Sequence, residues 1–381
     1  MTSPFPTIST SLATVTPPAV AGTRRALLSP IPGEPGEFLM VIDNSSLEKF
    51  TTCPKSSEFY LIDGREAHAR NSALVFGGAI HAAMEELEWG RDASIQDQRI
   101  VDFFANNPTP PGDYRTVNVA LQVMKHYRQR LEWAFPDLKP WLGLADANGK
   151  QIVEQAFEIP LGVIEVNAPI DMPWLTQEES IGQQRVHTTM EPPATAIHVR
   201  HIHIAWSGRI DRVAHTNSID RVCDHKTTSI AGNQITDEYH LSNPMLGYTW
   251  AGRKLYPHLN IQGACINFIH LKKPGVSGYG ADLTAKGSRG GEPPLSFFRA
   301  YYEYSDERLA WWESNVLAIC GDFISNLVRG YFPSHTKSCI GKYGKCQYWD
   351  VCVNDSLAVQ QSLIKSDLFR QVTWNPTAER A

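Results

Sequence analysis

The sequence predicts a mixed α/β domain, because helical and strand patterns alternate along the chain. Apolar residues recur at helical spacing in residues 72–90, where Ile80, Met84 and Leu87 form one stripe. Residues 151–161 instead alternate between apolar and polar positions, which is the pattern of a strand with one buried face. Interleaved patterns of both kinds are typical of mixed α/β folds.

The predicted elements follow one another in a definite order. They are helices at residues 44–62, 72–90 and 116–134, strands at 151–161, 201–214 and 219–227, a helix that begins at Ser242-Asn243-Pro244, strands at 261–271 and 297–304, and a long helix at 307–331. Proline is tolerated in the first turn of a helix, so Pro244 supports that helix start. Residues 166–200 and 273–294 carry prolines or glycines without a steady period and predict loops.

Composition and charge restrict the class of protein. Hydrophobic residues make up 42% of the 381 residues, which is enough for a sizeable core, and no apolar run reaches the length of a membrane span. We therefore expect an enzyme with no membrane partner. The formal net charge of -5 gives no broad basic face, so DNA binding would need a local basic track. The candidates for that track are Arg209, Arg212, Arg253, Lys254, Lys272 and Lys273.

We expect one folded domain at residues 44–355. Residues 1–43 are rich in Ser, Thr and Pro and predict a mobile tail, and residues 356–381 are expected to form a C-terminal tail. The seven cysteines, an odd number, suit a reducing compartment better than a disulfide scaffold, so the expected location is the cytoplasm.

Two predicted strands carry the residues with the clearest chemistry. The first contains Gly208-Arg209-Ile210-Asp211, and the second contains Asp224-His225-Lys226. Side chains alternate between the faces of a strand, so Asp224 and Lys226 point the same way and His225 points opposite. Two carboxylates can hold a hard divalent cation, and a nearby ammonium can orient the attacking water and balance phosphate charge. The arrangement predicts metal-dependent phosphodiester cleavage, whereas a hairpin with solvent-facing charges is the alternative.

Two further residues are candidates for the same site. His81 lies beside the apolar stripe of the helix at 72–90, where it is either a structural histidine or a third metal ligand. Glu154 lies on the strand at 151–161, on the face opposite its apolar residues. We interpret Glu154 as a solvated strand residue rather than a metal ligand.

These motifs resemble the RecB-like branch of the PD-(D/E)xK nuclease superfamily, which includes CRISPR-associated exonucleases. The ordered matches are Gly77 and His81 for a G-x-x-x-H helix, Gly208 to Asp211 for G-R-I-D, Asp224 and Lys226 for D/E-x-K, and Tyr248 for the tyrosine of a Q-x-x-x-Y helix. Pro244 stands where that motif has glutamine, so Gln234 and Asn243 are candidates to supply the contact. The resemblance implies an α-β-β-β-α-β core of the restriction-endonuclease type with helical elaborations.

The resemblance also implies the roles of these residues in DNA hydrolysis with Mg2+ or Mn2+. Asp211, Asp224 and His81 would bind the cation, and the backbone carbonyl of His225 would be a further ligand. Lys226 would position the attacking water. Tyr248 would contact the DNA strand.

The expected activity is that of an exonuclease on single-stranded DNA or DNA ends, in recombination, repair or phage DNA processing. A structure-selective endonuclease, a CRISPR spacer-processing factor and a catalytically decayed DNA-end-binding protein are the alternatives. The sequence has no G-x-x-x-x-G-K-[ST] loop, so any motor would be a separate helicase, working alongside recombination or CRISPR proteins.

Four cysteines form a further pattern, with Cys53 early and Cys339, Cys346 and Cys352 late as C-x6-C-x5-C. Iron–sulfur clusters need four thiolates, whereas zinc sites usually bring paired C-x2-4-C knuckles, which neither half of this pattern has. The layout resembles that of the iron–sulfur branch of the same family. The resemblance implies a [4Fe-4S] cluster that closes the N-terminal part of the domain against the C-terminal part, with zinc as the alternative. Cys223, Cys265 and Cys320 lie in apolar patterns and are expected to be buried thiols.

Overall fold

The computed structural model of the chain describes residues 8–9, 27–68, 72–132, 141–169, 197–216, 218–230, 232–274, 283–284, 293–341 and 344–372. The chain forms two compact units. Unit 1 comprises Met1–His68, Glu158–Gly208 and Ala310–Ala378, and unit 2 comprises Ala69–Phe157, Arg209–Leu309 and Glu379–Ala381. The chain crosses from one unit to the other within β6 (Val153–Pro169) and β7 (Ile197–Thr216). No described helix is both long and apolar enough to cross a membrane.

Unit 2 is built on a mixed sheet. The end of β7 pairs antiparallel with β8 (Ile219–Thr228) and with the short β5 (Leu142–Gly143), and β8 pairs in parallel with β9 (Ile261–Leu271). β10 (Leu295–Glu303) completes the sheet by pairing antiparallel with β9. Gly263 permits the pairing, since a Cβ there would lie 1.9 Å from the carbonyl oxygen of Tyr302. The strands predicted at 219–227, 261–271 and 297–304 are therefore present, with ends that agree within two residues.

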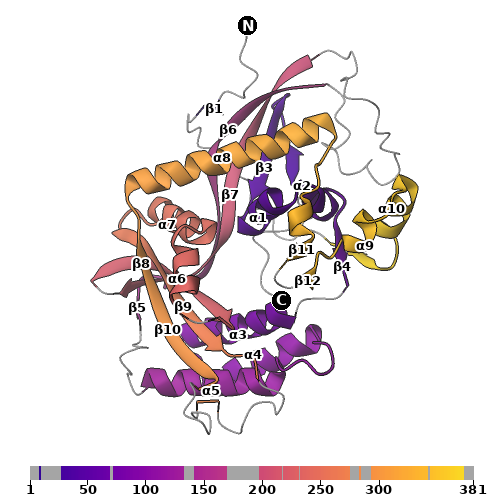
Figure 1. The fold of residues 1–381 in the computed structure, drawn as a ribbon. Helices are drawn as coiled ribbons and strands as arrows, with labels where there is room; N and C mark the ends of the chain where they lie inside the picture. The colour runs from indigo at the N-terminus through magenta and orange to yellow at the C-terminus, as the bar shows by residue number, and fades with distance from the viewer. Residues whose placement is uncertain are drawn as a thin grey trace. The chain divides into compact units, whose positions relative to one another are not determined.

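Three helices cover one face of this sheet (Figure 1). They are α3 (Ser72–Glu88), α4 (Ala93–Asn106) and α5 (Val117–Glu132). The predicted stripe residues Ile80 and Met84 are fully buried and share a core with Ile269 and Phe297 of the sheet. The sequence did not predict α4, because exposed apolar residues such as Ile95 and Val101 accompany its buried ones and blur its stripe.

Two shorter helices, α6 (Asn233–His240) and α7 (Asn243–Leu255), lie over the opposite face. The hydroxyls of Tyr302 and Tyr304 donate to the carbonyls of Thr236 and His240, at 2.8 and 3.0 Å. Gly252 lets α7 approach the sheet closely, since a Cβ there would lie 2.8 Å from the Val222 side chain. The helix predicted from Ser242 is confirmed as α7. α6 was not predicted, because a helix of eight residues offers too few turns for a periodic signal.

Unit 1 contains a second group of strands and helices. β1 (Ile8–Ser9) pairs antiparallel with β6, β2 (Leu28–Pro30) pairs antiparallel with β3 (Glu37–Ile42), and β3 runs parallel to β7. β4 (Arg65–Ala67) pairs antiparallel with β13 (Phe369–Gln371). The long helix α8 (Asp306–Arg329) begins in unit 2 and continues in unit 1, where Phe323 stacks on Phe50 with ring centroids 3.9 Å apart.

The helix predicted at residues 44–62 is divided into three pieces. These are α1 (Asn44–Thr52), α2 (Pro54–Ser57) and the π-helical turn η1 (Glu58–Ile62). Asp43 begins α1, since its carboxylate accepts a 2.7 Å hydrogen bond from the Ser46 amide. The break falls at Cys53, whose backbone is extended because the following residue is Pro54.

The chain termini differ from the sequence prediction. β2 and β3 lie within residues 1–43 but form paired strands, and Phe38, Met40 and Ile42 of β3 are buried. α10 (Leu357–Ile364) and β13 likewise lie within the predicted C-terminal tail. The tail predictions are wrong for these segments, because a short apolar segment is ordered when neighbouring strands cover it. Most of residues 1–26, and residues 373–381, lie outside the described residues, as do 170–196, 275–282 and 285–292 of the predicted loops.

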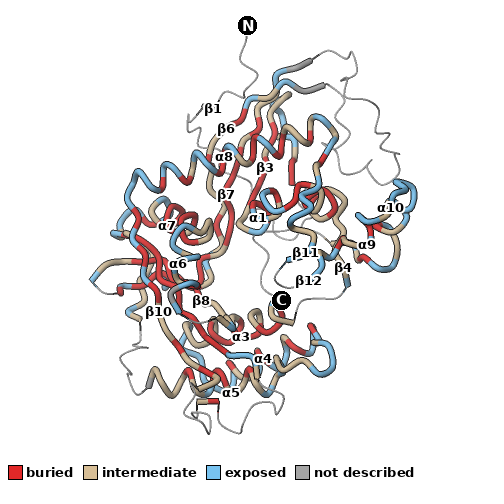
Figure 2. The backbone as a smooth tube through the Cα atoms, viewed as in Figure 1, coloured by how far each residue is buried: buried red, intermediate tan, exposed pale blue. Residues whose placement is uncertain are grey.

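The remaining described elements form the C-terminal part of unit 1. They are η2 (Thr336–Ser338), β11 (Ile340–Gly341), β12 (Gly344–Lys345) and α9 (Trp349–Cys352). β11 and β12 pair as a hairpin. Tyr348 and Val351 pack with Phe59 and Phe369 in a small core of this unit, and Figure 2 shows the buried segments in red.

Candidate active site

The β7–β8 hairpin brings two buried carboxylates together. The antiparallel pairing ends at Arg212 and Cys223, and Asp211 and Asp224 are the next residues of the two strands beyond that pair. Lys226 Nζ lies 2.8 and 2.6 Å from the two carboxylate oxygens of Asp224. This contact confirms that Asp224 and Lys226 share one face of the sheet. The His225 ring lies on the other face, where it stacks on Trp141 with centroids 5.3 Å apart.

The protonation of Lys226 follows from its neighbours. Burial alone lowers the pKa of a lysine, but the carboxylates of Asp224 and Asp211 outweigh burial and raise the pKa of Lys226 above its ordinary value. Lys226 is therefore an ammonium at neutral pH. In this form it can donate hydrogen bonds and offset negative charge.

His81 reaches the carboxylates from α3. Its Nδ1 lies 3.3 Å from Asp211 Oδ2. One turn earlier, Gly77 allows α3 to approach β8, since a Cβ at this position would lie 3.1 Å from the Thr227 hydroxyl oxygen. The G-x-x-x-H spacing thus has a physical basis, because the glycine gives the helix the close approach that its histidine needs.

Glu154 is the residue that sequence reasoning misjudged. His81, Glu154 and Asp211 each offer a ligand atom, and these atoms all lie within 4.8 Å of one another. The Glu154 side chain is only 6% exposed, so its interpretation as a solvated strand residue is wrong. Its φ is 47°, a left-handed backbone conformation within β6 that the face alternation of a regular strand does not anticipate. The sequence carried no local signal for it.

Three arginines expected on a DNA track instead make contacts within the chain. Arg209 donates to the Glu154 carbonyl at 2.9 Å, and its Nε lies 3.8 Å from a Glu154 carboxylate oxygen. Arg212 is buried and forms an ion pair with Glu88. Arg253 donates to the carbonyls of Ile261 and Tyr304, both at 2.7 Å. The prediction is therefore corrected for these three arginines, whereas Lys272 and Lys273 are exposed.

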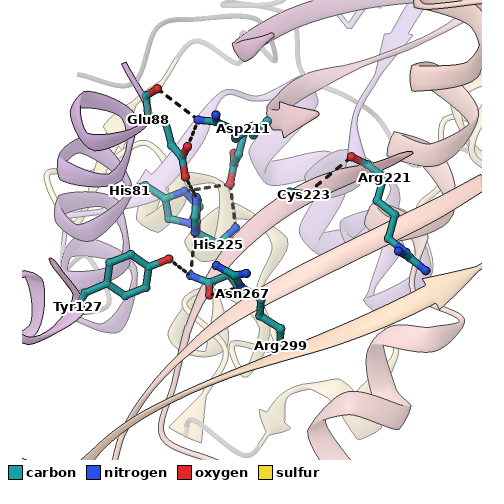
Figure 3. Close-up of polar contacts among 10 residues, drawn as sticks. His81, Glu88, Tyr127, Asp211, Arg221, Cys223, His225, Asn267 and Arg299 are labelled. Carbon is teal, nitrogen blue, oxygen red and sulfur yellow. Dashed lines mark hydrogen bonds and ion pairs between the residues drawn. The ribbon is translucent and has the colours of Figure 1, made fainter. Parts of the chain in front are cut away.

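His225 belongs to a buried polar network behind the carboxylates (Figure 3). Its backbone N–H donates to Asp211 Oδ2 at 3.0 Å. Asn267 Nδ2 lies 3.0 Å from both His225 Nδ1 and the Tyr127 hydroxyl, and Asn267 Oδ1 accepts from Arg299 Nε at 3.3 Å. Because the amide nitrogen can only donate, His225 Nδ1 is the acceptor, and we assign the ring proton to Nε2.

The network keeps the His225 ring neutral and links α3 to the sheet. Burial lowers the pKa of His225 to about 4, although the charges of Asp211 and Asp224 act in the opposite direction. His225 Nε2 faces Glu88 Oε1 at 3.6 Å, and Glu88 is in turn paired with Arg212. Residues on α3, α5, β8 and β9 thereby hold the amide that orients Asp211. The role predicted for the His225 carbonyl as a metal ligand stays a prediction.

Tyr248 lies on α7, one of the two helices over the face of the sheet that carries Lys226. Its ring meets the Phe157 ring edge-on, with centroids 6.3 Å apart. Of the two candidates for the missing glutamine, Gln234 is exposed on α6 and Asn243 begins α7.

The four patterned cysteines all lie in unit 1. Cys53 stands at the break between α1 and α2, the Cys346 amide donates to the Cys339 carbonyl at 2.8 Å, and Cys352 ends α9. Burial raises the pKa of Cys346, and it raises that of Cys352 to about 11, with further rises from the other thiolates of the set. Cys223, Cys265 and Cys320 are fully buried, as predicted.

Comparison with known proteins gives one family. Residues 44–353 match the model of the PD-(D/E)XK nuclease superfamily. A solved structure described as "Putative exonuclease" from Eubacterium rectale is similar at 10% identity, with a TM-score of 0.43 over 83% of this chain and 88% of that one. A search of curated proteins gives no match.

The family match agrees with the fold and with the site. The helix α3, the strands β6, β7 and β8, the helix α7 and the strand β9 give the α-β-β-β-α-β order that the sequence predicted. Residues 44–353 also include His81, Glu154, Asp211, Asp224 and Lys226. The chain therefore belongs to the PD-(D/E)XK nuclease superfamily and is a hydrolytic nuclease with the mixed α/β fold of that family.

Proposed function

We propose that this nuclease is a metal-dependent DNA exonuclease that acts on single-stranded DNA or DNA ends during recombination, repair or phage DNA processing. The observation that carries the proposal is the convergence of His81, Glu154 and Asp211 beside the Asp224–Lys226 pair. Carboxylates and an imidazole around one point, with an ammonium next to them, suit phosphodiester hydrolysis.

The side chains present fit a divalent cation. Asp211 and Glu154 offer carboxylate oxygens, which Mg2+ and Mn2+ prefer, and His81 offers a nitrogen that favours Mn2+. Asp224, whose two oxygens contact Lys226 Nζ, is a further candidate ligand outside this group of three. The carbonyl of His225 is a further candidate ligand. When bound, such a cation lowers the pKa of a water molecule and stabilises charge on the scissile phosphate.

The residues of the chain account for the other parts of the reaction. The His225 amide holds Asp211 in one orientation, and the Asp224 carboxylate holds the ammonium of Lys226. Lys226 would orient the attacking water and offset the charge that develops on the phosphate. Tyr248 of α7 would contact the DNA strand.

Digestion of end-labelled single-stranded DNA tests this function. We expect the wild-type protein to release short labelled products with Mn2+, to be slower with Mg2+, and to be inactive with a chelator. An exonuclease releases the label from one end first, whereas internal cuts would indicate the structure-selective or CRISPR spacer-processing endonuclease. DNA binding with no cleavage under any metal would favour the decayed end-binding protein and contradict the proposal.

We propose that Cys53, Cys339, Cys346 and Cys352 bind a [4Fe-4S] cluster, as in RecB-like nucleases of the iron–sulfur type. Burial, and after it the charges of the other cysteines of the set, raise the pKa of Cys346 and of Cys352. Four such cysteines are a donor set that a cationic metal centre would stabilise as thiolates. Zinc is the alternative occupant, since thiolates also suit zinc. A thiolate-bound centre of this type favours a reducing compartment such as the cytoplasm. We further propose that a separate helicase or recombination protein supplies the single strand.

Replacing Cys346 with serine is expected to remove iron and visible absorbance from anaerobically purified protein and to lower its Tm, because binding energy of a metal centre is also folding energy. Iron content, zinc content and the absorption spectrum are the measurements. Cys320→Ala is the matched control, since Cys320 is a buried thiol outside the set and its loss should lower Tm but leave the iron in place. A colourless wild-type protein that contains zinc in an amount equal to protein would mean that these cysteines bind zinc and not a cluster.

A further inference from the structure

The face of the sheet that carries Asp224 and Lys226 continues as an aromatic surface. Phe268 of β9 is the cross-strand neighbour of Lys226, and Phe298 of β10 is in turn the neighbour of Phe268. The two phenylalanine rings are stacked with centroids 4.8 Å apart. Phe268 is fully buried, so another group covers it on this face.

Tyr239 of α6 is part of that cover. Its ring meets the Phe268 ring in a T-shaped contact, with centroids 5.6 Å apart. The position of α6 is itself constrained, because Tyr302 and Tyr304 donate to carbonyls on its first and last turns. Ser242 adds a hydrogen bond from its hydroxyl to the Tyr239 carbonyl at 2.9 Å. Tyr239 is thus held next to the strand position that carries Lys226, and it remains partly exposed.

We propose that the hydroxyl of Tyr239 binds an oxygen of one DNA phosphate group, the neighbour in the strand of the phosphate group that Lys226 faces. The proposal rests on the proposed function of the site, and it adds a binding residue from an element outside the family motifs. The ring of Tyr239 contacts Phe268, so in this proposal the hydroxyl rather than the ring face meets the strand. A phenol is a neutral hydrogen-bond donor that suits a phosphate oxygen.

The surroundings of Lys226 support this placement. Phe268 is the cross-strand neighbour of Lys226 and Tyr239 packs on Phe268, so each helix over this face contributes one tyrosine to the side of the sheet that carries the lysine. Tyr248 comes from α7 and Tyr239 from α6. A strand whose scissile phosphate reaches Lys226 therefore meets a donor from each helix.

Steady-state kinetics of Tyr239→Phe on a single-stranded oligonucleotide test the proposal. The substitution keeps the ring contact with Phe268 and removes only the hydroxyl. We expect KM to rise about tenfold with kcat within about twofold. The variant loses one hydrogen bond to a charged group, and it loses that bond equally in the bound substrate and in the transition state. The dependence of KM on salt should keep its slope, since a neutral donor releases no counterion from DNA.

The matched control is Tyr301→Phe. Tyr301 lies on β10 next to Tyr302 but points to the other face of the sheet, so KM should not change. Thermal unfolding of both variants shows whether the fold is kept. An active wild type with an unchanged KM in Tyr239→Phe would refute the role of Tyr239 and leave the nuclease function intact. A wild type that cleaves no DNA would refute the function, and the role of Tyr239 with it.

Discussion

Lys226→Ala is expected to lower kcat by about 10³-fold, comparable to the loss of one preorganised donor in other hydrolases. The ammonium contacts both oxygens of Asp224, and the pKa of Lys226 is raised, so the charge is present throughout the neutral pH range. Without it, the attacking water loses a donor and the developing phosphate charge loses a counterion. Single-turnover cleavage of end-labelled DNA with saturating Mn2+ measures the effect.

The same substitution also leaves the buried Asp224 carboxylate without its ammonium, so stability must be measured with activity. Lys226→Met keeps the length of the side chain and serves as a second variant. The matched control is Lys125→Ala, because Lys125 is an exposed lysine on α5 in the same unit. Wild-type cleavage by a folded Lys226→Ala protein would contradict the assignment.

The second large effect is expected for Glu154→Gln. This change keeps the size of the side chain and removes one negative charge from the group formed with His81 and Asp211. We expect half-maximal activity to need at least about 100-fold more Mn2+, since even residues behind metal ligands alter affinity by about 10–100-fold. The measurement is a titration of cleavage rate against metal concentration, with Mn2+ binding to the protein alone as an independent readout.

Glu165→Gln provides the comparison for this variant. Glu165 is on the same strand, but its side chain is 50% exposed. Identical metal titrations for Glu154→Gln and Glu165→Gln would mean that Glu154 holds no metal. The contact of Arg209 with the Glu154 carbonyl does not depend on the substituted group, so local structure should be kept.

Local patterns predicted much of the catalytic hairpin. The alternation of a strand is enough to place Asp224 and Lys226 on one face, and their 2.8 Å contact follows from it. The strand at 261–271 was predicted with the ends that β9 has, because a mostly apolar segment there is bounded by the polar residues Asn260 and Lys272. The Gly77–His81 spacing likewise describes one turn of helix, which is a local property.

Partners distant along the chain were not predictable in this way. As basic residues, Arg209 and Arg212 were candidates for a DNA track. In the folded chain they form ion pairs with Glu154 and Glu88, which lie on other elements. α6 is too short to give a periodic signal of its own, and the hydroxyls of Tyr302 and Tyr304 hold it in place. In each case the deciding contact joins residues more than 50 positions apart.

The sequence by itself determined the mixed α/β class, the hairpin with Asp211, Asp224 and Lys226, and the family to which these motifs point, because strand alternation and helical spacing act over a few residues. Only the tertiary structure decided that Glu154 joins His81 and Asp211, that the neutral ring of His225 is fixed between Glu88 and Asn267, and that Tyr239 packs on Phe268, the cross-strand neighbour of Lys226. Burial and long-range contacts assign these roles, and both exist only once the chain has folded.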